Sequence, residues 1–277
     1  MSELPAIGRH AAAYLGEADT RLGEEFLERG RVVLPVDDPA GLARIRQAAA
    51  GLAAAHLGLA APEAGAEGDF LDFIHRHVQP SDLNALRLAV IEGLNAQPWL
   101  RPVYHGLARR ALDAIVGNEL AMQRRVNLSI QLPGDADSLL PIHADCWSGD
   151  SPYEVVAWLP LVDCRATKSM YLTPPAAALR LAARFADLPS AEALFRAVEA
   201  EVEWLEVPFG SVLLFSQNLP HGNRPNREAE TRWSLNCRFK AVFTPYADKK
   251  PGEFFDPITL RPASRLGLAH RFPEVGR

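Results

Sequence analysis

The sequence has few cysteines, no long apolar run and no cluster of basic residues, and each absence argues against a class of protein. The three cysteines, Cys146, Cys164 and Cys237, form no Cys-x-x-Cys pair, which argues against a disulfide scaffold and favours a reducing compartment. No stretch of about 18 apolar residues occurs, so no membrane span is expected. With no run of five Lys/Arg residues and a net charge of −5, nucleic-acid binding is not expected either.

The composition is that of an ordinary globular protein, with 48% apolar and 23% charged residues in a chain of 277. The Ala-rich opening segment continues with Glu17, Asp19 and Arg21, which is not the pattern of a secretory signal peptide. We therefore expect a cytoplasmic protein. A chain of this length can form one large structural domain with a sizeable core.

The periodicity of apolar residues changes near residue 120. Before it, three segments that begin near Asp38, Ser81 and Arg101 place apolar residues at helical spacing, and the third ends at Gly117. After it, short strand-like segments follow one another. We predict a helical N-terminal region over 1–120, a β core over 121–246 with a helical insert at 176–203, and a C-terminal tail over 247–277.

Two of the strand-like segments alternate between polar and apolar residues. In 125–132 one face would carry Asn127, Ser129 and Gln131, and in 232–243 one face would carry Arg232 and Ser234. Other short strands are expected at 154–162, 169–173 and 210–215. Many short strands beneath a helical layer predict a mainly β fold of the α+β class, with a double-sheet jelly-roll core.

The tripeptide His143-Ala144-Asp145 is the first candidate for a chemical function. In an extended segment, residues two apart point the same way, so the imidazole and the carboxylate can bind one metal ion. His221 follows the 210–215 strand and a short turn, where it can supply a second imidazole. Two histidines and one carboxylate form the facial triad of non-heme Fe(II) oxygenases.

An Arg-x-Ser motif strengthens this reading. Arg232 and Ser234 share a face of the alternating strand, eleven residues after His221. A guanidinium binds a carboxylate through two hydrogen bonds, and a neighbouring hydroxyl adds a third. A buried arginine also requires an anionic partner. The pair therefore predicts a site for the distal carboxylate of 2-oxoglutarate.

The segments RVNLSIQLPGD, SLLPIHADCWSGDSPYEVVAWLPLVDC, GSVLLFSQNLPHGN and ETRWSLNCRFK carry a resemblance to a known family. Over about residues 125–264 the chain resembles the Fe(II)/2-oxoglutarate-dependent dioxygenases of the phytanoyl-CoA-hydroxylase-like kind. It is most similar to the oxygenases scattered in surface-carbohydrate gene clusters.

The resemblance implies a double-stranded β-helix core, a cupin-like jelly roll. It implies Fe(II) bound by His143, Asp145 and His221, and 2-oxoglutarate bound by Arg232 and Ser234. The implied reaction consumes O2, converts 2-oxoglutarate to succinate and hydroxylates a small molecule, such as a carbohydrate or another polar metabolite. Asp145 argues against a halogenase, which would have a small residue there.

Further residues are weaker candidates, and each has a structural alternative. Cofactor contacts are possible for Asn127 and Gln131, or these form a structural polar ladder, and for Tyr171, which also suits a core position. Substrate contacts are possible for Trp147, Ser148 and Glu154, or these belong to a loop that binds nothing. Surface positions are expected for Arg224, Arg227, His75 and His77.

The competing interpretation is a cupin-like barrel that holds a divalent metal as an isomerase or a binding module. Such a barrel does not require Arg232 and Ser234, and it would release no succinate from 2-oxoglutarate. In either case the expected partner is a small molecule, and no sequence feature indicates an oligomeric state.

Overall fold

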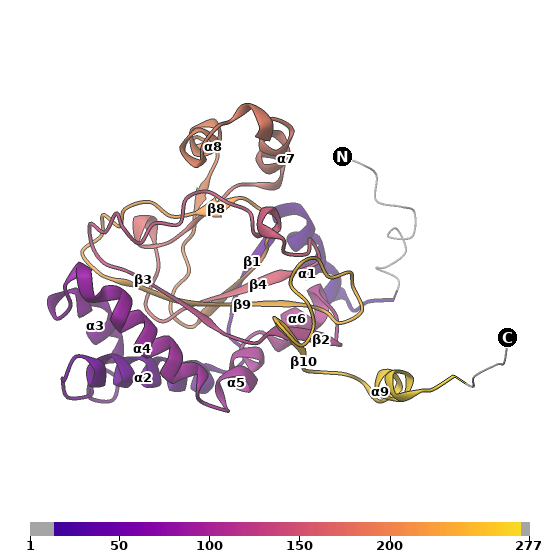
Figure 1. Ribbon diagram of the computed structural model, residues 1–277, viewed down its shortest axis with the longest axis horizontal. Helices are drawn as coiled ribbons and strands as arrows, with labels where there is room; N and C mark the ends of the chain where they lie inside the picture. Colours follow the sequence, from indigo (N-terminus) through magenta and orange to yellow (C-terminus); the bar gives the residue numbers. More distant parts are fainter. Residues whose placement is uncertain (1–13, 273–277) are drawn as a thin grey trace.

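The computed structural model describes residues 14–272 (Figure 1). A large sheet has the strand order β1 (Arg31–Pro35), β7 (Ser211–Ser216), β4 (Val155–Pro160), β9 (Arg232–Ala241), β2 (Leu120–Gln123) and β10 (Phe255–Pro257), and β3 (Asn127–Gln131) also pairs with β9. A small sheet consists of β6 (Glu203–Trp204), β5 (Tyr171–Leu172) and β8 (His221–Gly222). The pairs between these strands are antiparallel.

A helical layer covers one face of the large sheet. The N-terminal part contains α1 (Glu17–Arg29), α2 (Pro39–His56), α3 (Glu67–Asp72), α4 (Leu83–Asn95), α5 (Leu100–Gly106) and α6 (Arg109–Ile115). Figure 1 shows α2, α3 and α4 below β3 and β9. Ile45 and Leu86 of this layer are fully buried, and their apolar side chains form one core with those of the sheet.

Strand β9 separates this core from the opposite face of the sheet. Trp233 and Leu235 are fully buried in the core, and the indole Nε1 of Trp233 donates to the Leu71 carbonyl of α3 at 2.9 Å. Because side chains alternate along a strand, Arg232 and Ser234 face the other way. The alternation read from the sequence thus gives the correct two faces of β9.

The region between β5 and β6 carries a second, smaller core. Helices α7 (Pro175–Ala183) and α8 (Ala191–Val198) project above β8 in Figure 1. Tyr171 packs against Phe195 of α8 and Trp204 of β6, with ring centroids 5.2 and 5.4 Å apart. We call this projection, residues 171–204, the arm. Its helices α7 and α8 lie in the segment 176–203 that was expected to be helical, with α7 beginning one residue earlier.

The architecture agrees with a mixed fold of helices and antiparallel sheet, and differs in detail from the expectation. Strand β1 lies inside the N-terminal region expected to be helical, and β10 lies in the segment expected to be a tail. The helix expected from Arg101 to Gly117 is divided into α5 and α6, because Ala108 leaves helical geometry with φ −134°. A last helix, α9 (Pro262–Ala269), follows β10. Over residues 14–272, no helix combines the length and apolarity of a bilayer span.

Candidate metal centre

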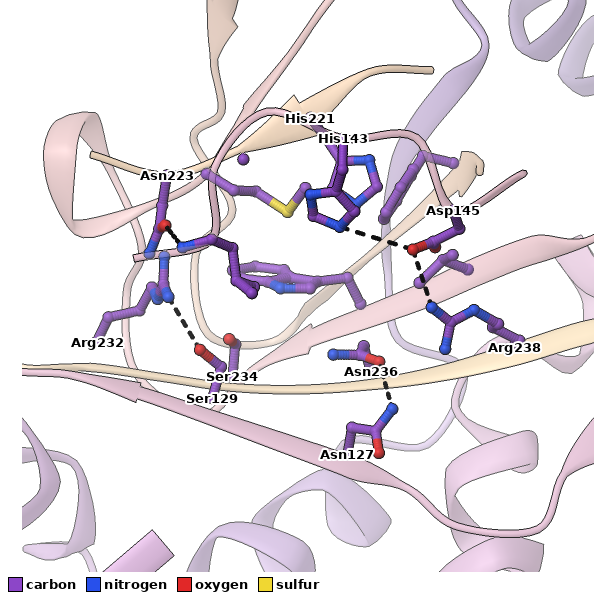
Figure 2. Close-up of a pocket in the computed structure, with 16 residues that line it drawn as sticks. Asn127, Ser129, His143, Asp145, His221, Asn223, Arg232, Ser234, Asn236 and Arg238 are labelled. Carbon is purple, nitrogen blue, oxygen red and sulfur yellow. Dashed lines mark hydrogen bonds and ion pairs between the residues drawn. The ribbon is translucent and has the colours of Figure 1, made fainter. Parts of the chain in front are cut away.

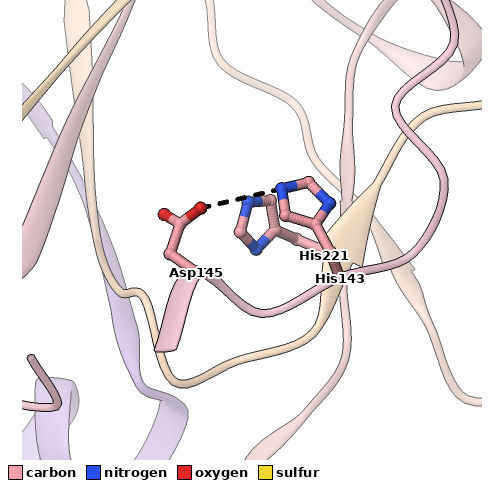
Figure 3. A group of neighbouring side chains, drawn as sticks. All are labelled: His143, Asp145 and His221. Carbon is pink, nitrogen blue, oxygen red and sulfur yellow. Dashed lines mark ion pairs between the residues drawn. The ribbon is translucent and has the colours of Figure 1, made fainter. Parts of the chain in front are cut away.

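Two backbone hydrogen bonds bring the predicted histidines together. His143 N donates to His221 O at 2.9 Å, and His221 N donates to His143 O at 2.8 Å, so two residues far apart in sequence become direct neighbours. Their ring centroids lie 4.4 Å apart. Asp145 begins a one-turn 3-10 helix, Asp145–Ser148, and its Oδ1 lies 3.7 Å from Nε2 of His143. One potential ligand atom from each residue lies within 4.8 Å of the other two (Figure 3).

Backbone carbonyls determine which imidazole nitrogen is free to bind a metal. Nδ1 of His143 lies 2.8 Å from Pro141 O, and Nδ1 of His221 lies 2.9 Å from Leu219 O. A carbonyl oxygen only accepts, so we assign the proton to Nδ1 in both rings. Nε2 is then left as the metal ligand in each case, and the same contacts fix the orientation of the rings.

The electrostatics of the three residues suit a divalent cation. Burial, together with the neighbouring His143, lowers the pKa of His221 to about 4, which keeps this imidazole neutral at pH 7. Burial opposes the ionisation of Asp145, but Arg238 and the two imidazoles outweigh it and lower the pKa of this carboxyl. Neutral imidazole and ionised carboxylate are the forms that bind metal. Two nitrogens and one oxygen, without a thiolate, fit the facial-triad donor set.

The three residues lie at one side of a cavity of about 250 Å³ that both sheets line (Figure 2). Its polar wall comes from β3 and β9 of the large sheet, and its apolar wall includes Trp158 of β4 and Phe215 of β7. The residues that line it are Asn127, Ser129, Leu140, His143, Asp145, Val156, Trp158, Met170, Phe215, His221, Gly222, Asn223, Arg232, Ser234, Asn236 and Arg238.

Arg232 lies in this cavity as a buried cation. It is 3% exposed, and its guanidinium donates to Ser169 O at 3.0 Å and to Ser129 Oγ at 2.9 Å. Within residues 14–272, Nε of Arg232 and the Ser234 hydroxyl have no hydrogen-bond partner, and no carboxylate forms an ion pair with Arg232. Burial lowers the pKa of Arg232 to about 10. Unpaired buried donors are costly, so this arrangement fits an anionic ligand.

The other residues considered for the co-substrate lie in two different environments. Asn127 lines the cavity, and its Nδ2 donates to Oδ1 of Asn236 at 3.2 Å. Gln131 is fully buried beyond the cavity lining, where its Nε2 donates to Arg224 O at 2.8 Å and its Oε1 accepts from Asn223 at 3.1 Å. Tyr171 is fully buried in the core of the arm. The structure thus places Asn127 at the cavity, and Gln131 and Tyr171 away from its lining.

The three residues considered for substrate contact also separate. Trp147 is 36% exposed and lies edge to face with Phe185, with ring centroids 4.8 Å apart, and Ser148 beside it is exposed. Glu154 is 2% exposed and lies outside the cavity lining, where it accepts a hydrogen bond from Ser151 N at 3.0 Å. None of the three lines the cavity: Trp147 and Ser148 are accessible to solvent, whereas Glu154 is buried.

Glu154 gives a prediction about stability. Burial, reinforced by the Asp150 carboxylate, raises its pKa from 4.5 to about 7. The folded protein retains this proton while the unfolded chain loses it, so the free energy of unfolding decreases as the pH rises from 4.5 to 7. Glu154→Gln removes that decrease. The variant should gain roughly 2–3 kcal/mol relative to wild type between pH 5 and pH 8, measured by urea unfolding. If the difference in the free energy of unfolding between Glu154→Gln and wild type is the same at pH 5 and pH 8, the raised pKa of Glu154 is wrong.

The other basic residues considered from the sequence, Arg224, Arg227, His75 and His77, lie outside the cavity. Arg224 pairs with Glu192 at 2.7 Å and stacks on Phe195, and Arg227 is exposed. His75 is half-buried and its Nδ1 lies 3.0 Å from Thr231 Oγ1, whereas His77 is exposed. Neither Arg224 nor Arg227 therefore competes with Arg232 for a ligand in the cavity.

The cavity lining also includes residues that the sequence did not single out as site candidates, among them Met170, Asn223, Asn236 and Arg238. Asn236 and Arg238 follow Arg232 and Ser234 on the polar face of β9, so the alternation itself carried a signal for them. Asn223 follows His221 by two residues, and its Oδ1 accepts from Leu140 N at 2.6 Å. Met170 has no such local signal.

Comparison with solved structures shows similar folds at low sequence identity. The chain is similar to the nickel complex of the non-heme monooxygenase ThoJ (16% identity, TM-score 0.53, 92% of this chain and 89% of that chain). It is also similar to EctD from S. alaskensis (16%, TM-score 0.51, 92% and 85%) and to AviO1 from Streptomyces viridochromogenes Tue57 (17%, TM-score 0.50, 83% and 97%). No protein-family model matches the chain, and no curated protein matches it.

Proposed function

We propose that this chain is an Fe(II)- and 2-oxoglutarate-dependent oxygenase with a double-stranded β-helix core. One observation carries the proposal: a His–Asp–His triad lines the same cavity as a buried arginine that has no anionic partner among residues 14–272. The triad alone fits several divalent metals, but the arginine adds a requirement for an anion. The similarity in fold to the non-heme monooxygenase ThoJ, whose structure contains nickel, supports the proposal.

In this proposal His143, Asp145 and His221 hold the metal. Bound Fe(II) supplies the site at which O2 is activated, with 2-oxoglutarate as the co-substrate. The protein contributes two imidazoles whose Nδ1 atoms are held by backbone carbonyls, which leaves Nε2 of each ring as the ligand atom. The apolar walls around Trp158 and Phe215 limit access of water to this side of the cavity.

Arg232 and Ser234 bind the distal carboxylate of 2-oxoglutarate. The unpartnered Nε of Arg232 and the unpartnered hydroxyl of Ser234 supply two donors, while Ser169 O and Ser129 Oγ orient the guanidinium. Asn127 is our candidate for a second polar contact with the co-substrate, because it lines the same cavity. In this proposal Gln131 and Tyr171 have structural roles. Gln131 accepts a hydrogen bond from Asn223, which lines the cavity, and Tyr171 packs against Phe195 in the arm.

The primary substrate is a small molecule, such as a carbohydrate or another polar metabolite, and the reaction is a hydroxylation. Trp147 and Ser148 are our candidates for contact with it, because both are exposed directly after the ligand Asp145. We propose that the N-terminal region 1–120, the core 121–246 and the C-terminal segment 247–277 act as one structural domain in the cytoplasm.

Succinate formation tests the proposal. The purified protein with Fe(II), ascorbate and 2-oxoglutarate in air should produce succinate at a slow basal rate, and a true primary substrate should increase that rate. Candidate sugars and polar metabolites can therefore be screened with one assay. Tight Zn(II) or Ni(II) binding, with no succinate under any condition, would instead favour the cupin-like isomerase or binding module.

A further inference from the structure

Arg238 contacts the carboxylate of the triad directly. It lies on β9, on the same face as Arg232 but at the opposite side of the cavity, as Figure 2 shows. Its Nη2 lies 3.0 Å from Oδ1 of Asp145, and the side chains are only 14% and 9% exposed. An ion pair this well shielded from water fixes the geometry of both groups more strongly than a surface pair does.

The rest of the Arg238 guanidinium is also engaged, unlike that of Arg232. Its Nε lies 3.5 Å from Oδ1 of Asp150 and donates to Oε1 of Gln217 at 3.3 Å, while its Nη1 donates to Oε1 of Gln123 at 3.4 Å. Asp150 in turn forms an ion pair with Lys249. Each of the three nitrogens of the Arg238 guanidinium thus has a partner within the protein.

The loop that carries Asp145 and Asp150 is fastened to a segment near the C-terminus. Asp248 N donates to Gly149 O at 3.0 Å, and Ser151 Oγ donates to Pro245 O at 2.6 Å. Gly149 has φ +83°, a left-handed backbone conformation that favours glycine, and it lies against the Asp248 side chain.

We propose that Arg238 is the positioning residue of the metal centre. It holds the Asp145 carboxylate in one orientation toward His143 and His221, and Asp150 with Lys249 holds Arg238. Asp145, Arg238, Asp150 and Lys249 carry two negative and two positive charges, so the positive charge of Arg238 is balanced locally. Its effect on metal affinity is therefore mainly geometric. The inference rests on the proposed function only in requiring that the triad binds a metal.

Direct Co(II) binding tests this role without turnover. Hydrogen-bond partners of metal ligands are commonly worth about 10- to 100-fold in metal affinity. Arg238→Met should therefore weaken Co(II) binding about 10- to 100-fold, with a changed visible spectrum of the bound ion. Arg238→Lys, which retains a charged donor, should restore part of the affinity. Asp150→Asn should cause a smaller loss, because it leaves Arg238 in place but releases one side of it.

Arg101→Met is the matched control. Arg101 also forms an arginine–aspartate pair, with Asp256 at 3.1 Å, and it is half-buried but does not line the cavity. Its replacement should leave Co(II) affinity unchanged. If Arg238→Met does not fold, the double variant Arg238→Met with Asp150→Leu removes both charges and should show the same loss of affinity.

Two outcomes overturn the inference, and they are distinguishable. If wild type binds Co(II) and the Arg238 variants bind it equally well or more tightly, Arg238 does not position the ligand, and the proposed function is unaffected. Tighter binding would show that the arginine competes with the cation for Asp145. If wild type binds no Co(II), the proposed function fails and this inference fails with it.

Discussion

Asp145→Ala should abolish succinate formation and weaken Co(II) binding by more than about 100-fold, beyond the range expected for hydrogen-bond partners of the ligands. The variant removes the only anionic donor of the triad and leaves the two imidazoles. The protein should still fold, because its main core consists of the apolar faces of the sheet and the helical layer. Calorimetric Co(II) titration, a succinate assay and a thermal melt measure the three effects.

Asp69→Ala is the control for this variant, since Asp69 is an exposed carboxylate in α3 that does not line the cavity. It should retain wild-type affinity and turnover. Retention of tight Co(II) binding by Asp145→Ala would show that the triad is not the metal centre. Arg238 would still have Asp150 as a partner, so a loss of fold is not the expected explanation for a loss of binding.

The periodicity of the local sequence was sufficient to predict which residues of β9 share a face, and that His143 and Asp145, two residues apart, can point the same way. Alternation along a strand is set by neighbouring residues, so Arg232 and Ser234 could be assigned to one face and Trp233 to the other without knowledge of the fold. His221 required one further step, because its pairing with His143 depends on how β8 approaches the loop before Asp145. The pairing could be inferred from chemistry, because His221 adds the second imidazole to His143 and Asp145 and completes a metal-binding triad.

Periodicity could not predict how far the cavity extends along a strand. Gln131 shares the polar face of β3 with Asn127 and Ser129, yet it lies at the end of the strand and is fully buried against Arg224 O and Asn223. Strands β1 and β10 were missed for a related reason. Each is short and lies at an edge of the sheet, and its pairing partner is more than 100 residues away in the sequence.

The ion pairs of Arg238 could not be predicted from the local sequence either. The alternating pattern places it on the face of Arg232, six residues further along β9. The local sequence does not distinguish Arg232, which has no carboxylate partner among residues 14–272, from Arg238, which is paired with carboxylates of the protein. The difference arises from Asp145 and Asp150, which reach it from a loop about 90 residues earlier.

Arg232→Lys should weaken 2-oxoglutarate binding about ten- to hundredfold. Lysine retains the positive charge but loses the planar pair of donors, and the loss of one or two charge-assisted hydrogen bonds costs roughly 1.5–3 kcal/mol. Arg232→Ala should be worse, because Ser234 would then face the carboxylate alone while the positions filled by the guanidinium become empty. The KM for 2-oxoglutarate in the succinate assay, and its Kd in the presence of Co(II), measure the effect.

Metal affinity distinguishes the Arg232 variants from Asp145→Ala. Arg232 contacts Ser169 and Ser129 but none of the three triad residues, so Co(II) binding without co-substrate should change little in either variant. Arg224→Ala and Arg227→Ala are the matched controls, because both arginines lie outside the cavity and should leave the KM for 2-oxoglutarate near its original value. A sharp increase of that KM in Arg227→Ala, with no effect of Arg232→Lys, would move the carboxylate site away from Arg232. It would also remove the observation that distinguishes a 2-oxoglutarate enzyme from a metal-binding barrel.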